Sequence, residues 1–477
     1  MYYLLNERYR LCGWDKLPYA VVDRKYGSAC VVTKPVMDTL DLCNGKIDFS
    51  IPLISNEQRD IAQELLKEGI ICQCEPGAEL KNIQKYRLYD NRYMQTVHWS
   101  VTGRCNCKCK HCYISGADDK YGELSHNDVM KIIDDMGNCG VLNCTLTGGE
   151  ALIRSDFWDI VDGILERDIR IFRIYSNGFL VNETFLNGLK ERGISPEINM
   201  SFDGTGTHDW LRGITGAEKA VRKAFLLCRD MGIPTGAEMC LWKGNSHTLR
   251  QSINDLADMG CSNLKVTPVT NTGAWKEGGY GETDSLSEEE LFSTFYEYLD
   301  DFYEDLPRML VHLGGFFLAD GNNPDHFSLP AVHCYNDPLR ASICVHARND
   351  LYISAEGRAE TCMAMSSMPA EFQSKFPLIQ ERGLKECLTD SAYMKLIDTR
   401  SEEIIERNEK CRACRYRTVC LGGCRAGAVM YHPEEILSSD EMVCKMYRDG
   451  WVSKIIDKVT KLQPNAKSVE AEIYKKM

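Results

Sequence analysis

Long hydrophobic runs are missing from this sequence. No stretch of about 18 apolar residues occurs, so no transmembrane helix is expected. The N-terminal segment MYYLLNERYR has no basic region leading into an apolar run, so no secretory signal is expected. Positive charge is also scarce, because 56 Lys and Arg face 69 Asp and Glu, a net charge of -13. A protein that tracks nucleic-acid phosphates carries a basic face, so we expect neither a nucleic-acid nor a membrane partner.

Cysteine, by contrast, is abundant, with 23 residues in a chain of 477. A long chain without a secretory signal is expected in the cytoplasm, where disulfides are rare. Clustered cysteines there more often bind metal or carry redox chemistry. Hydrophobic residues make up 44% of the chain, which excludes a disordered protein, and the length suits about two to four domains.

Residues 1–90 are predicted to form a small domain of short strands and helices. We expect strands from Pro18 and Ala29, helices over Pro35–Leu42 and Asn56–Leu66, and a closing strand from Gly69. This order of elements suits a winged helix-turn-helix-like domain. The segment is not basic enough to make DNA the leading partner.

Between Thr96 and Pro268, six short apolar runs alternate with helical stretches. The runs are VHWSVT, VLNCTLT, RIFRIYS, EINMSFD, GAEMCLW and NLKVTPV. Strands alternating with helices imply a parallel sheet covered by helices, and six repeats fit a partial β/α barrel better than a full eight-unit barrel. Beyond it, Ser287 and Glu290 form a capping box that begins another helix, and Trp451–Leu462 is an amphipathic helix.

A first cysteine cluster follows the first of these strands. Cys105, Cys109 and Cys112 have the spacing C-x3-C-x2-C. Three thiolates on one tight loop can bind a [4Fe–4S] cluster and leave one iron open for a small molecule. Cys107 adds a fourth thiol, and four thiols could hold structural zinc. Zinc needs two well-separated pairs, whereas these four are crowded on one loop, so we expect Cys107 to face away.

This loop resembles that of the radical S-adenosylmethionine (radical SAM) enzymes, in which CxxxCxxC follows the first strand of a partial (β/α)6 barrel. The resemblance implies an α/β fold with such a barrel over residues 94–330, which binds SAM and one [4Fe–4S] cluster. It places SAM contacts at Tyr113 beside the motif and at successive strand ends: Gly148, Gly149, Glu150, Ser176, Asn177, Ser201, Asp203, Arg212 and, in the sixth strand, Val266. Taken singly, each of these positions is also compatible with a turn or a solvated side chain.

The resemblance also implies roles for several of these residues. Glu150 would hold the SAM amino group, and Arg212 would pair with the SAM carboxylate, which suits a guanidinium fork. Ser201 would contact the ribose or the carboxylate, and Val266 would present backbone to the adenine. Ala151 stands where these enzymes usually have proline, which is a departure from the pattern.

A second cysteine cluster occupies the C-terminal third of the chain. It contains Cys344 and Cys362 on either side of Gly357, and then Cys411, Cys414, Cys420, Cys424 and Cys444. Cysteine for cysteine, this pattern resembles the SPASM extension of radical SAM enzymes, here over residues 331–450 and followed by a C-terminal helix within 451–477. A zinc ribbon would explain four of the seven cysteines and leave the others unexplained.

The SPASM resemblance implies two auxiliary [4Fe–4S] clusters, and so three in all. The first would take Cys344, Cys362 and Cys424, and the second Cys411, Cys414, Cys420 and Cys444. Cys334 is the favoured fourth ligand of the first auxiliary cluster; the alternative is an iron left open for substrate. Most remaining cysteines, such as Cys144, are expected to fill the core.

The resemblance implies a function as well. Radical SAM enzymes abstract a hydrogen atom from substrate with a 5′-deoxyadenosyl radical, and no catalytic protein residue can be assigned from the sequence. The position and element order of residues 1–90 resemble the peptide-recognition domain of peptide maturases, which binds a leader peptide as an added strand. The leading hypothesis is therefore a maturase of a ribosomally made precursor peptide that forms a Cys thioether, similar to the sactipeptide and ranthipeptide synthases.

Several alternatives stay open at the level of sequence. Similar enzymes form carbon–carbon cross-links or epimerise residues. Sulfatase maturases have an aspartate where Met363 stands here, which weakens that interpretation. A non-catalytic Fe–S electron carrier or regulator would not need a SAM site. The expected partners of the enzyme are a precursor peptide with its leader and an electron donor such as flavodoxin or ferredoxin.

Overall fold

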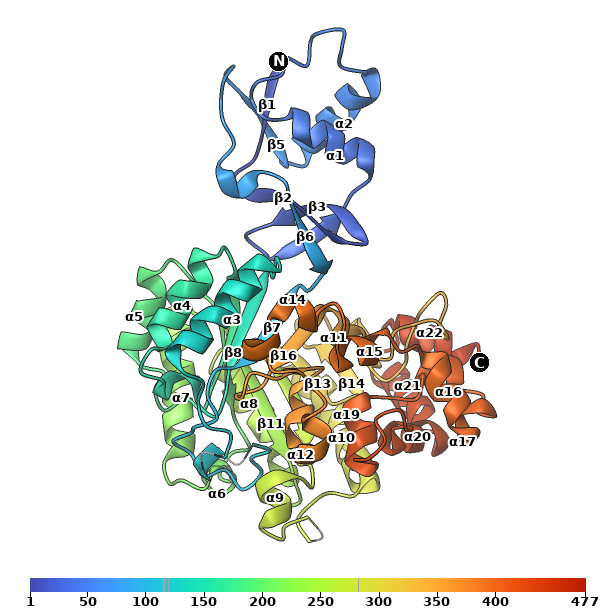
Figure 1. Cartoon of the computed structure of the whole chain (residues 1–477). Coiled ribbons are helices and arrows are strands. Elements are labelled where there is room, and N and C mark those ends of the chain that lie inside the picture. Colours follow the sequence, from blue (N-terminus) through green and yellow to red (C-terminus); the bar gives the residue numbers. More distant parts are fainter. Residues whose placement is uncertain (115, 119, 282) are drawn as a thin grey trace.

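The chain folds into a small N-terminal unit that stands on a larger α/β body (Figure 1). The structure is a computed structural model and describes residues 1–114, 116–118, 120–281 and 283–477. Within these residues, no helix has both the length and the apolar character needed to cross a membrane.

The N-terminal unit contains two sheets and two helices. Its elements are β1 (Tyr2–Leu5), β2 (Tyr9–Asp15), β3 (Leu17–Asp23), β4 (Ser28–Val31), α1 (Lys34–Leu42), α2 (Asn56–Lys67), β5 (Ile71–Cys74), η1 (Asn82–Gln84) and β6 (Arg87–Arg92). One sheet has the order β4-β3-β2-β6, and the other pairs β1 with β5. The two helices and the strands predicted from Pro18, Ala29 and Gly69 are confirmed, whereas β1, β2 and β6 were not predicted. The winged-helix assignment itself stays a prediction.

The six predicted strands and their helices are all present in the α/β body. The elements are β7 (Thr96–Ser100), η2 (Gly116–Asp118), α3 (His126–Asn138), β8 (Asn143–Thr147), η3 (Ala151–Ile153), α4 (Phe157–Glu166), β9 (Arg170–Ser176), α5 (Glu183–Glu191), β10 (Glu197–Ser201), α6 (His208–Arg212), α7 (Ala217–Asp230), β11 (Thr235–Leu241), η4 (Ser246–Thr248), α8 (Leu249–Asp258), β12 (Asn263–Pro268), α9 (Gly273–Glu277) and α10 (Glu288–Asp305). Ser287 and Glu290 form the predicted capping box of α10.

The parallel sheet does not stop at six strands. Its order is β15-β14-β13-β12-β11-β10-β9-β8-β7-β16-β17, with β13 (Leu310–Leu313) parallel to β12 and β16 (Asp350–Ile353) parallel to β7. The hairpin partners are β14 (Phe317–Asp320), β15 (Phe327–Ser328) and β17 (Ala359–Glu360). Strand β16 comes from the cysteine-rich region, so that region is built onto the open edge of the barrel beside the first cysteine loop.

The C-terminal third is otherwise made of short helices. They are α11 (Val345–Asn349), η5 (Met363–Ser367), α12 (Ala370–Gln373), α13 (Ile379–Arg382), α14 (Leu384–Cys387), α15 (Ala392–Asp398), α16 (Ser401–Arg407), α17 (Glu409–Arg412), α18 (Arg417–Cys420), α19 (Arg425–Tyr431), α20 (Glu441–Arg448), α21 (Trp451–Leu462) and α22 (Val469–Lys475). The predicted amphipathic helix over Trp451–Leu462 is α21, and its buried face includes Trp451 and Ile455.

The N-terminal unit is packed onto the barrel. Trp14 and Leu142 share a small hydrophobic core, and the Trp14 Nε1 group donates to the Cys139 carbonyl at 3.2 Å. The Asn143 amide at the start of β8 donates to the Gly27 carbonyl at 2.7 Å. This buried contact fixes the unit beside the first two barrel strands, so it is not a loosely tethered domain.

Candidate active site

The first cysteine loop leaves the carboxyl end of β7 and is surrounded by hydrogen-bond donors. The backbone N–H of Cys107 donates to the Cys105 Sγ at 3.4 Å, and that of Gly116 donates to the Cys112 Sγ at 3.3 Å. The Arg212 Nη1 group donates to the Cys109 Sγ at 3.6 Å. Donors of this kind stabilise thiolates that ligate iron, so the loop fits the [4Fe–4S] cluster that its spacing predicted.

Cys107 does not face away from this loop, contrary to the prediction. Its side chain is only 2% exposed. Hydrogen bonding with the sulfurs of Cys105 and then Cys109, together with burial, raises the pKa of the Cys107 thiol. The loop turns so tightly that alternate residues converge, and sequence spacing cannot show this. Cys107 thus lies beside two of the predicted ligands as a neutral thiol.

The Gly148-Gly149-Glu150 turn after β8 is pressed against the cysteine loop. The Gly149 N–H donates to the Thr102 carbonyl, and the Glu150 N–H to the Arg104 carbonyl, both at 2.8 Å. A Cβ on Gly149 would lie 2.1 Å from the Arg104 carbonyl oxygen and 3.0 Å from the Cys105 Cβ. Only glycine permits this close approach, which aligns the turn with the loop.

The Glu150 side chain is buried and accepts several hydrogen bonds at the end of β9. Donors are the Ser176 hydroxyl at 3.1 Å and the Asn177 N–H at 2.7 Å. Burial raises the pKa of the Glu150 carboxyl to about 7 in spite of these donors. A buried carboxylate is stabilised by a cation, so the site suits an ammonium group such as the SAM amino group.

Asn177 connects β9 to the cysteine loop. Its amide Nδ2 donates to the Asn106 side-chain oxygen at 2.6 Å and lies 3.9 Å from the Cys105 Sγ. The predicted Ser176 and Asn177 positions are therefore brought to the same end of the sheet as Glu150 and the cysteines. Asn106 was not predicted, and its only sequence signal was its place inside the motif.

Arg212 is held by a buried carboxylate. Its Nε group donates to Asp203 Oδ2 at 2.6 Å, and Asp203 Oδ1 accepts from the Cys240 N–H at 2.9 Å. Burial alone would raise the pKa of Asp203, but Arg212 and His208 hold it well below its usual range. The ion pair fixes the guanidinium so that another of its nitrogens faces Cys109.

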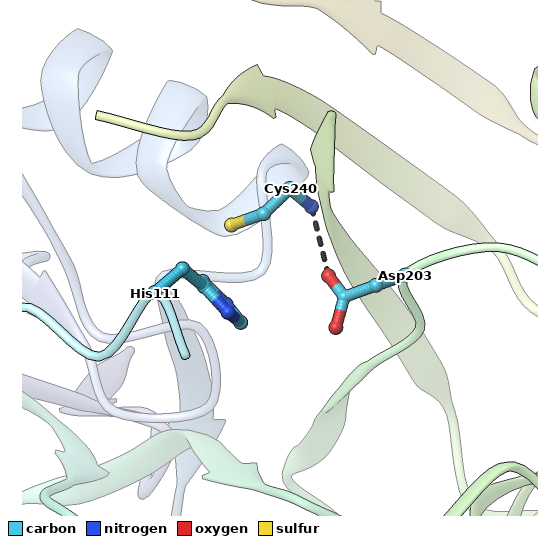
Figure 2. A group of neighbouring side chains, drawn as sticks. All are labelled: His111, Asp203 and Cys240. Carbon is cyan, nitrogen blue, oxygen red and sulfur yellow. Dashed lines mark hydrogen bonds between the residues drawn. The ribbon is translucent and has the colours of Figure 1, made fainter. Parts of the chain in front are cut away.

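His111 and Cys240 join the same cluster (Figure 2). One ligand atom each of His111, Asp203 and Cys240 lies within 4.8 Å of the others. Burial and then Arg212 lower the pKa of His111 to about 4, so its imidazole is neutral. The Arg212 cation already neutralises Asp203, which leaves this group poorly suited to a further metal ion. It instead ties the cysteine motif to β10 and β11.

Tyr113 lies against residues of the C-terminal third. Burial, together with the nearby Tyr352 hydroxyl, raises the pKa of Tyr113 well above its usual value. Glu360, from β17, also contributes to raising the pKa of Tyr113. Glu360 is fully buried, and its carboxylate accepts a hydrogen bond from the Ser366 hydroxyl at 2.7 Å. Tyr352 and Glu360 were not predicted, because they reach the site only through the pairing of β16 with β7.

The remaining two predicted SAM contacts differ in their placement. Ser201 is the last residue of β10, half-buried and next to Phe202 and Asp203. Val266 is fully buried, and its carbonyl accepts from the Gly314 N–H at 2.8 Å within the sheet. The structure thus brings Ser201 to the strand ends, whereas the carbonyl of Val266 is already bonded inside the sheet.

The electrostatic interactions of the seven SPASM-like cysteines group them into two sets, while their role as ligands of two auxiliary clusters stays a prediction. Cys362 interacts electrostatically with Cys424 and Cys344, and the Ala347 N–H donates to the Cys344 Sγ at 3.4 Å. After burial, the nearby Cys444 thiol contributes to raising the pKa of Cys411 and Cys420. The Cys414 thiol likewise contributes to raising the pKa of Cys411 and Cys444. The donor chemistry of both sets, thiols in close groups, fits iron–sulfur ligation.

Asp440 organises the second part of this region and was not predicted. Its buried carboxylate accepts from the Cys424 N–H at 3.0 Å and from the Val443 N–H at 3.2 Å. It therefore links Cys424 of one set to the helix α20 that carries Cys444 of the other. The N–H-to-carboxylate bonds have no signal in the sequence beyond an aspartate before a helix.

Cys334 lies near Tyr335, whose pKa is raised by burial and then by Cys344 and Cys334. Its side chain is exposed, and the sulfur contacts the Val332 carbonyl at 3.9 Å. Burial and then the Glu470 carboxylate of α22 raise the pKa of the Cys334 thiol. The role of Cys334 as the fourth ligand of the Cys344, Cys362 and Cys424 set stays a prediction.

Comparison with known proteins decides the family. The model of the radical SAM superfamily matches residues 99–256. A Fe-coproporphyrin III synthase of Methanosarcina barkeri is 34% identical over 364 residues, which span 74% of this chain and 88% of that protein. The chain belongs to the radical SAM superfamily. It is a SAM-dependent enzyme. Cys105, Glu150 and Arg212 lie close together where the SAM and cluster site is predicted, and their roles there stay predictions.

Two further similarities concern peptides. A PqqA peptide cyclase of Granulibacter bethesdensis is 25% identical over 332 residues, 69% of this chain and 81% of that protein. The structure of Streptococcus suis SuiB bound to S-adenosylmethionine matches with a TM-score of 0.60 and 12% identity, over 93% of this chain and 100% of that one. SuiB bound to the precursor peptide SuiA matches with a TM-score of 0.58. This structural likeness shows the shared fold.

Replacing Arg212 with alanine is expected to weaken SAM binding by about tenfold or more. A charge-assisted hydrogen bond is worth about 1.5–3 kcal/mol, and about 1.4 kcal/mol corresponds to a factor of ten. The Asp203→Asn variant should weaken binding in the same direction, because it releases the guanidinium from its orientation. Equilibrium binding of SAM to the reconstituted protein measures both. Arg229→Ala, on the exposed side of α7, is the control, and unchanged affinity in Arg212→Ala would make that residue structural.

Proposed function

We propose that this radical SAM enzyme modifies a ribosomally made precursor peptide, and that the modification is a thioether between a Cys thiol and a carbon of another residue. The observation that carries the proposal is the N-terminal unit, which is packed on the barrel and offers an open sheet edge. A cofactor-binding barrel alone would need no such unit.

The open edge is β4, the outermost strand of the order β4-β3-β2-β6. It has the sequence SACV, with no charge and no proline to block pairing, and Val31 is 58% exposed. Proteins usually blunt an exposed edge strand with charge, proline or a covering element. An unprotected edge supports recognition of a leader peptide as an added strand.

The similarities to peptide-acting proteins support the same proposal. The PqqA peptide cyclase shares sequence with most of this chain, and the SuiB structure that contains its precursor peptide SuiA matches across the N-terminal unit as well as the barrel, since 93% of this chain is covered. We extend the peptide substrate from these proteins to this chain as part of the proposal. A flavodoxin or ferredoxin as electron donor belongs to it too.

The residues of the site suit the chemistry of the family. When bound, SAM and the [4Fe–4S] cluster supply a 5′-deoxyadenosyl radical that abstracts a hydrogen atom from substrate. Cys105, Cys109 and Cys112 hold the cluster, Glu150 receives the SAM amino group, and Arg212 receives its carboxylate. The two SPASM-like cysteine sets provide two auxiliary clusters, for three in all. The burial of Glu150 excludes water from the ammonium and strengthens the pairing.

A second candidate is side-chain chemistry on a carboxylated tetrapyrrole. The 34% identity to a Fe-coproporphyrin III synthase favours it. The N-terminal unit is the feature that this candidate leaves unexplained. The two candidates predict different substrates and can be separated directly.

We expect the reduced, anaerobically reconstituted enzyme to convert a small Cys-containing peptide encoded beside its gene, and to leave Fe-coproporphyrin III and its carboxylated precursors unchanged. A thioether lowers the peptide mass by two hydrogen atoms and protects one thiol from alkylation, which mass spectrometry detects. A carbon–carbon cross-link shows the same mass change with the thiol still free, and epimerisation shows no mass change but takes up solvent deuterium.

Conversion of the tetrapyrrole alone would replace the peptide proposal with the second candidate. Absence of SAM cleavage in protein with full iron content would contradict the enzymatic role and favour an electron carrier or regulator.

A further inference from the structure

The inner face of the barrel sheet carries polar side chains. Along each strand, alternate residues pack with the surrounding helices in one hydrophobic core, as Leu264 and Val266 of β12 do. The residues between them therefore point to the interior of the barrel, because side chains alternate across a strand. These interior residues include His98, Tyr175, Glu238, Lys265 and His312.

Electrostatic interactions across the barrel show that these residues share one interior. After burial, the Lys265 ammonium contributes to lowering the pKa of two histidines. One is His98 of β7, at the other edge of the six-strand barrel, and the other is His312 of the neighbouring β13. Burial and then the Glu238 carboxylate raise the pKa of Tyr175. The Tyr175 ring stacks on His98, with ring centroids 5.3 Å apart. These residues therefore belong to one interior and not to separate surface sites.

Glu238 and Lys265 are neighbouring residues of opposite charge that form no ion pair with each other. They are register partners on the parallel strands β11 and β12. Among the residues that the structure describes, neither the carboxylate nor the ammonium forms a hydrogen bond or an ion pair. Burial raises the pKa of the Glu238 carboxyl although Lys265 opposes the shift, so this carboxylate lacks donors. Lys265 remains exposed and can reach a ligand.

Arg173 in the same interior is paired with Glu197 and donates to the Tyr175 hydroxyl, whereas the two histidines are neutral and lack partners. Burial lowers the pKa of His98 to about 3 and that of His312 to about 4, so both imidazoles are uncharged. The Nε2 atoms of both rings and the Oδ1 of Asn199 are buried without a hydrogen-bond partner among the described residues. Buried polar atoms are normally satisfied, so several together indicate that a polar ligand completes them.

This interior lies next to the SAM end of the barrel. Tyr175 directly precedes Ser176, which donates to Glu150. Glu238 is the register partner of Ser201, the last residue of β10. Glu238 is level with the end of β10, and Glu238 and Lys265 each lie three residues before the end of their own strands, β11 and β12. The pair therefore lies inside the barrel, about 10 Å below the strand ends at which ligands of such sheets bind.

We propose that Glu238 and Lys265 together hold an amide group of the substrate, the ammonium donating to its carbonyl oxygen and the carboxylate accepting from its N–H. The proposal rests on the peptide function proposed above and specifies it: the group inserted into the barrel is a peptide amide or an Asn or Gln side chain. An adjacent plus and minus charge favours a neutral ligand that has both a donor and an acceptor. Such a ligand meets both demands, whereas an anionic carboxylate would be attracted by Lys265 and repelled by Glu238.

The test compares the wild-type enzyme with Lys265→Met, Glu238→Leu and Glu238→Gln, using the peptide encoded beside the gene. Lys265→Met and Glu238→Leu should each raise KM for the peptide about tenfold, because each loses a charge-assisted hydrogen bond. Glu238→Gln should raise KM less than Glu238→Leu does, because its carbonyl oxygen still accepts from an N–H although the charge is lost. Lys190→Met and Glu191→Leu, on the exposed end of α5, are matched controls.

Iron content and SAM affinity, measured in the same preparations, identify any variant that has failed to fold. If Glu238→Leu fails to fold, Glu238→Gln still tests the role of the carboxylate. If both Glu238 variants lower KM while Lys265→Met raises it, the ligand is a carboxylate and the amide assignment is wrong. Unchanged KM in all three variants would also overturn it. A wild-type enzyme that leaves the peptide unmodified but converts a carboxylated tetrapyrrole overturns the proposed function, and the inference with it.

Discussion

Replacing Cys105, Cys109 and Cys112 together with alanine is expected to abolish SAM cleavage and to remove about four of about twelve irons per chain. The other two thiol sets, around Cys362 and Cys444, should retain their iron because they belong to a separate part of the fold. The N–H and guanidinium donors around the first loop would be left without thiolates to stabilise. Iron analysis and the yield of 5′-deoxyadenosine measure the two effects.

Cys107→Ala and Cys228→Ala are the matched controls. Cys228 is a buried core thiol of α7 and should change neither iron content nor cleavage. Cys107→Ala should also keep the cluster, even though its thiol lies beside Cys105 and Cys109. Loss of about four irons in the Cys107 variant would show that this residue is a ligand, and retained SAM cleavage in the triple variant would remove the basis of the assigned site.

Blocking the β4 edge is expected to reduce modification of a leader-bearing peptide about a hundredfold, because the peptide loses its high local concentration at the barrel. Val32 donates its N–H to the Tyr19 carbonyl of β3 at 3.0 Å, so in this antiparallel pair the N–H of the preceding Val31 points outward. Val31→Pro removes that outward donor and leaves the bond to β3 in place. Peptide turnover, followed by mass spectrometry, measures the effect.

Val31→Ala keeps the N–H and is the control for the lost side chain. A leaderless peptide should be modified equally by the wild type and by Val31→Pro, since the barrel is unchanged. Equal turnover of the leader-bearing peptide by both proteins would exclude β4 as the recognition edge. We prefer this variant to removal of residues 1–90, because removal would expose Leu142 and leave the Cys139 carbonyl without its Trp14 donor.

The sequence alone was enough wherever the signal is local. Helix spacing and capping residues are short-range, so α21 and the capping box at Ser287 were predicted within a residue. The order of six strands and helices was correct for the same reason. The β1, β2 and β6 strands were missed because their residues do not alternate cleanly between polar and apolar.

The candidate site was predictable where ligands lie at fixed spacing. The glycines before Glu150 lie against the C-x3-C-x2-C loop, and the seven later cysteines lie near one another in two sets, while the ligand roles of all these cysteines stay predictions. The side chain of Cys107 was placed wrongly, because spacing gives the identity of neighbours but not the direction in which a tight turn points them. Val266 is in the expected strand, but its carbonyl is used by the sheet.

Only the tertiary structure determined which residues far apart in the sequence contact one another. Strand β16 pairs with β7, about 250 residues away along the chain, and so brings Tyr352 and Glu360 to Tyr113. The placement of Glu238 beside Lys265 likewise depends on sheet register, since a shift of one residue would turn each side chain to the other face. Local sequence thus determined the elements and the spacing of the cysteines, and register determined which charged groups face the interior of the barrel.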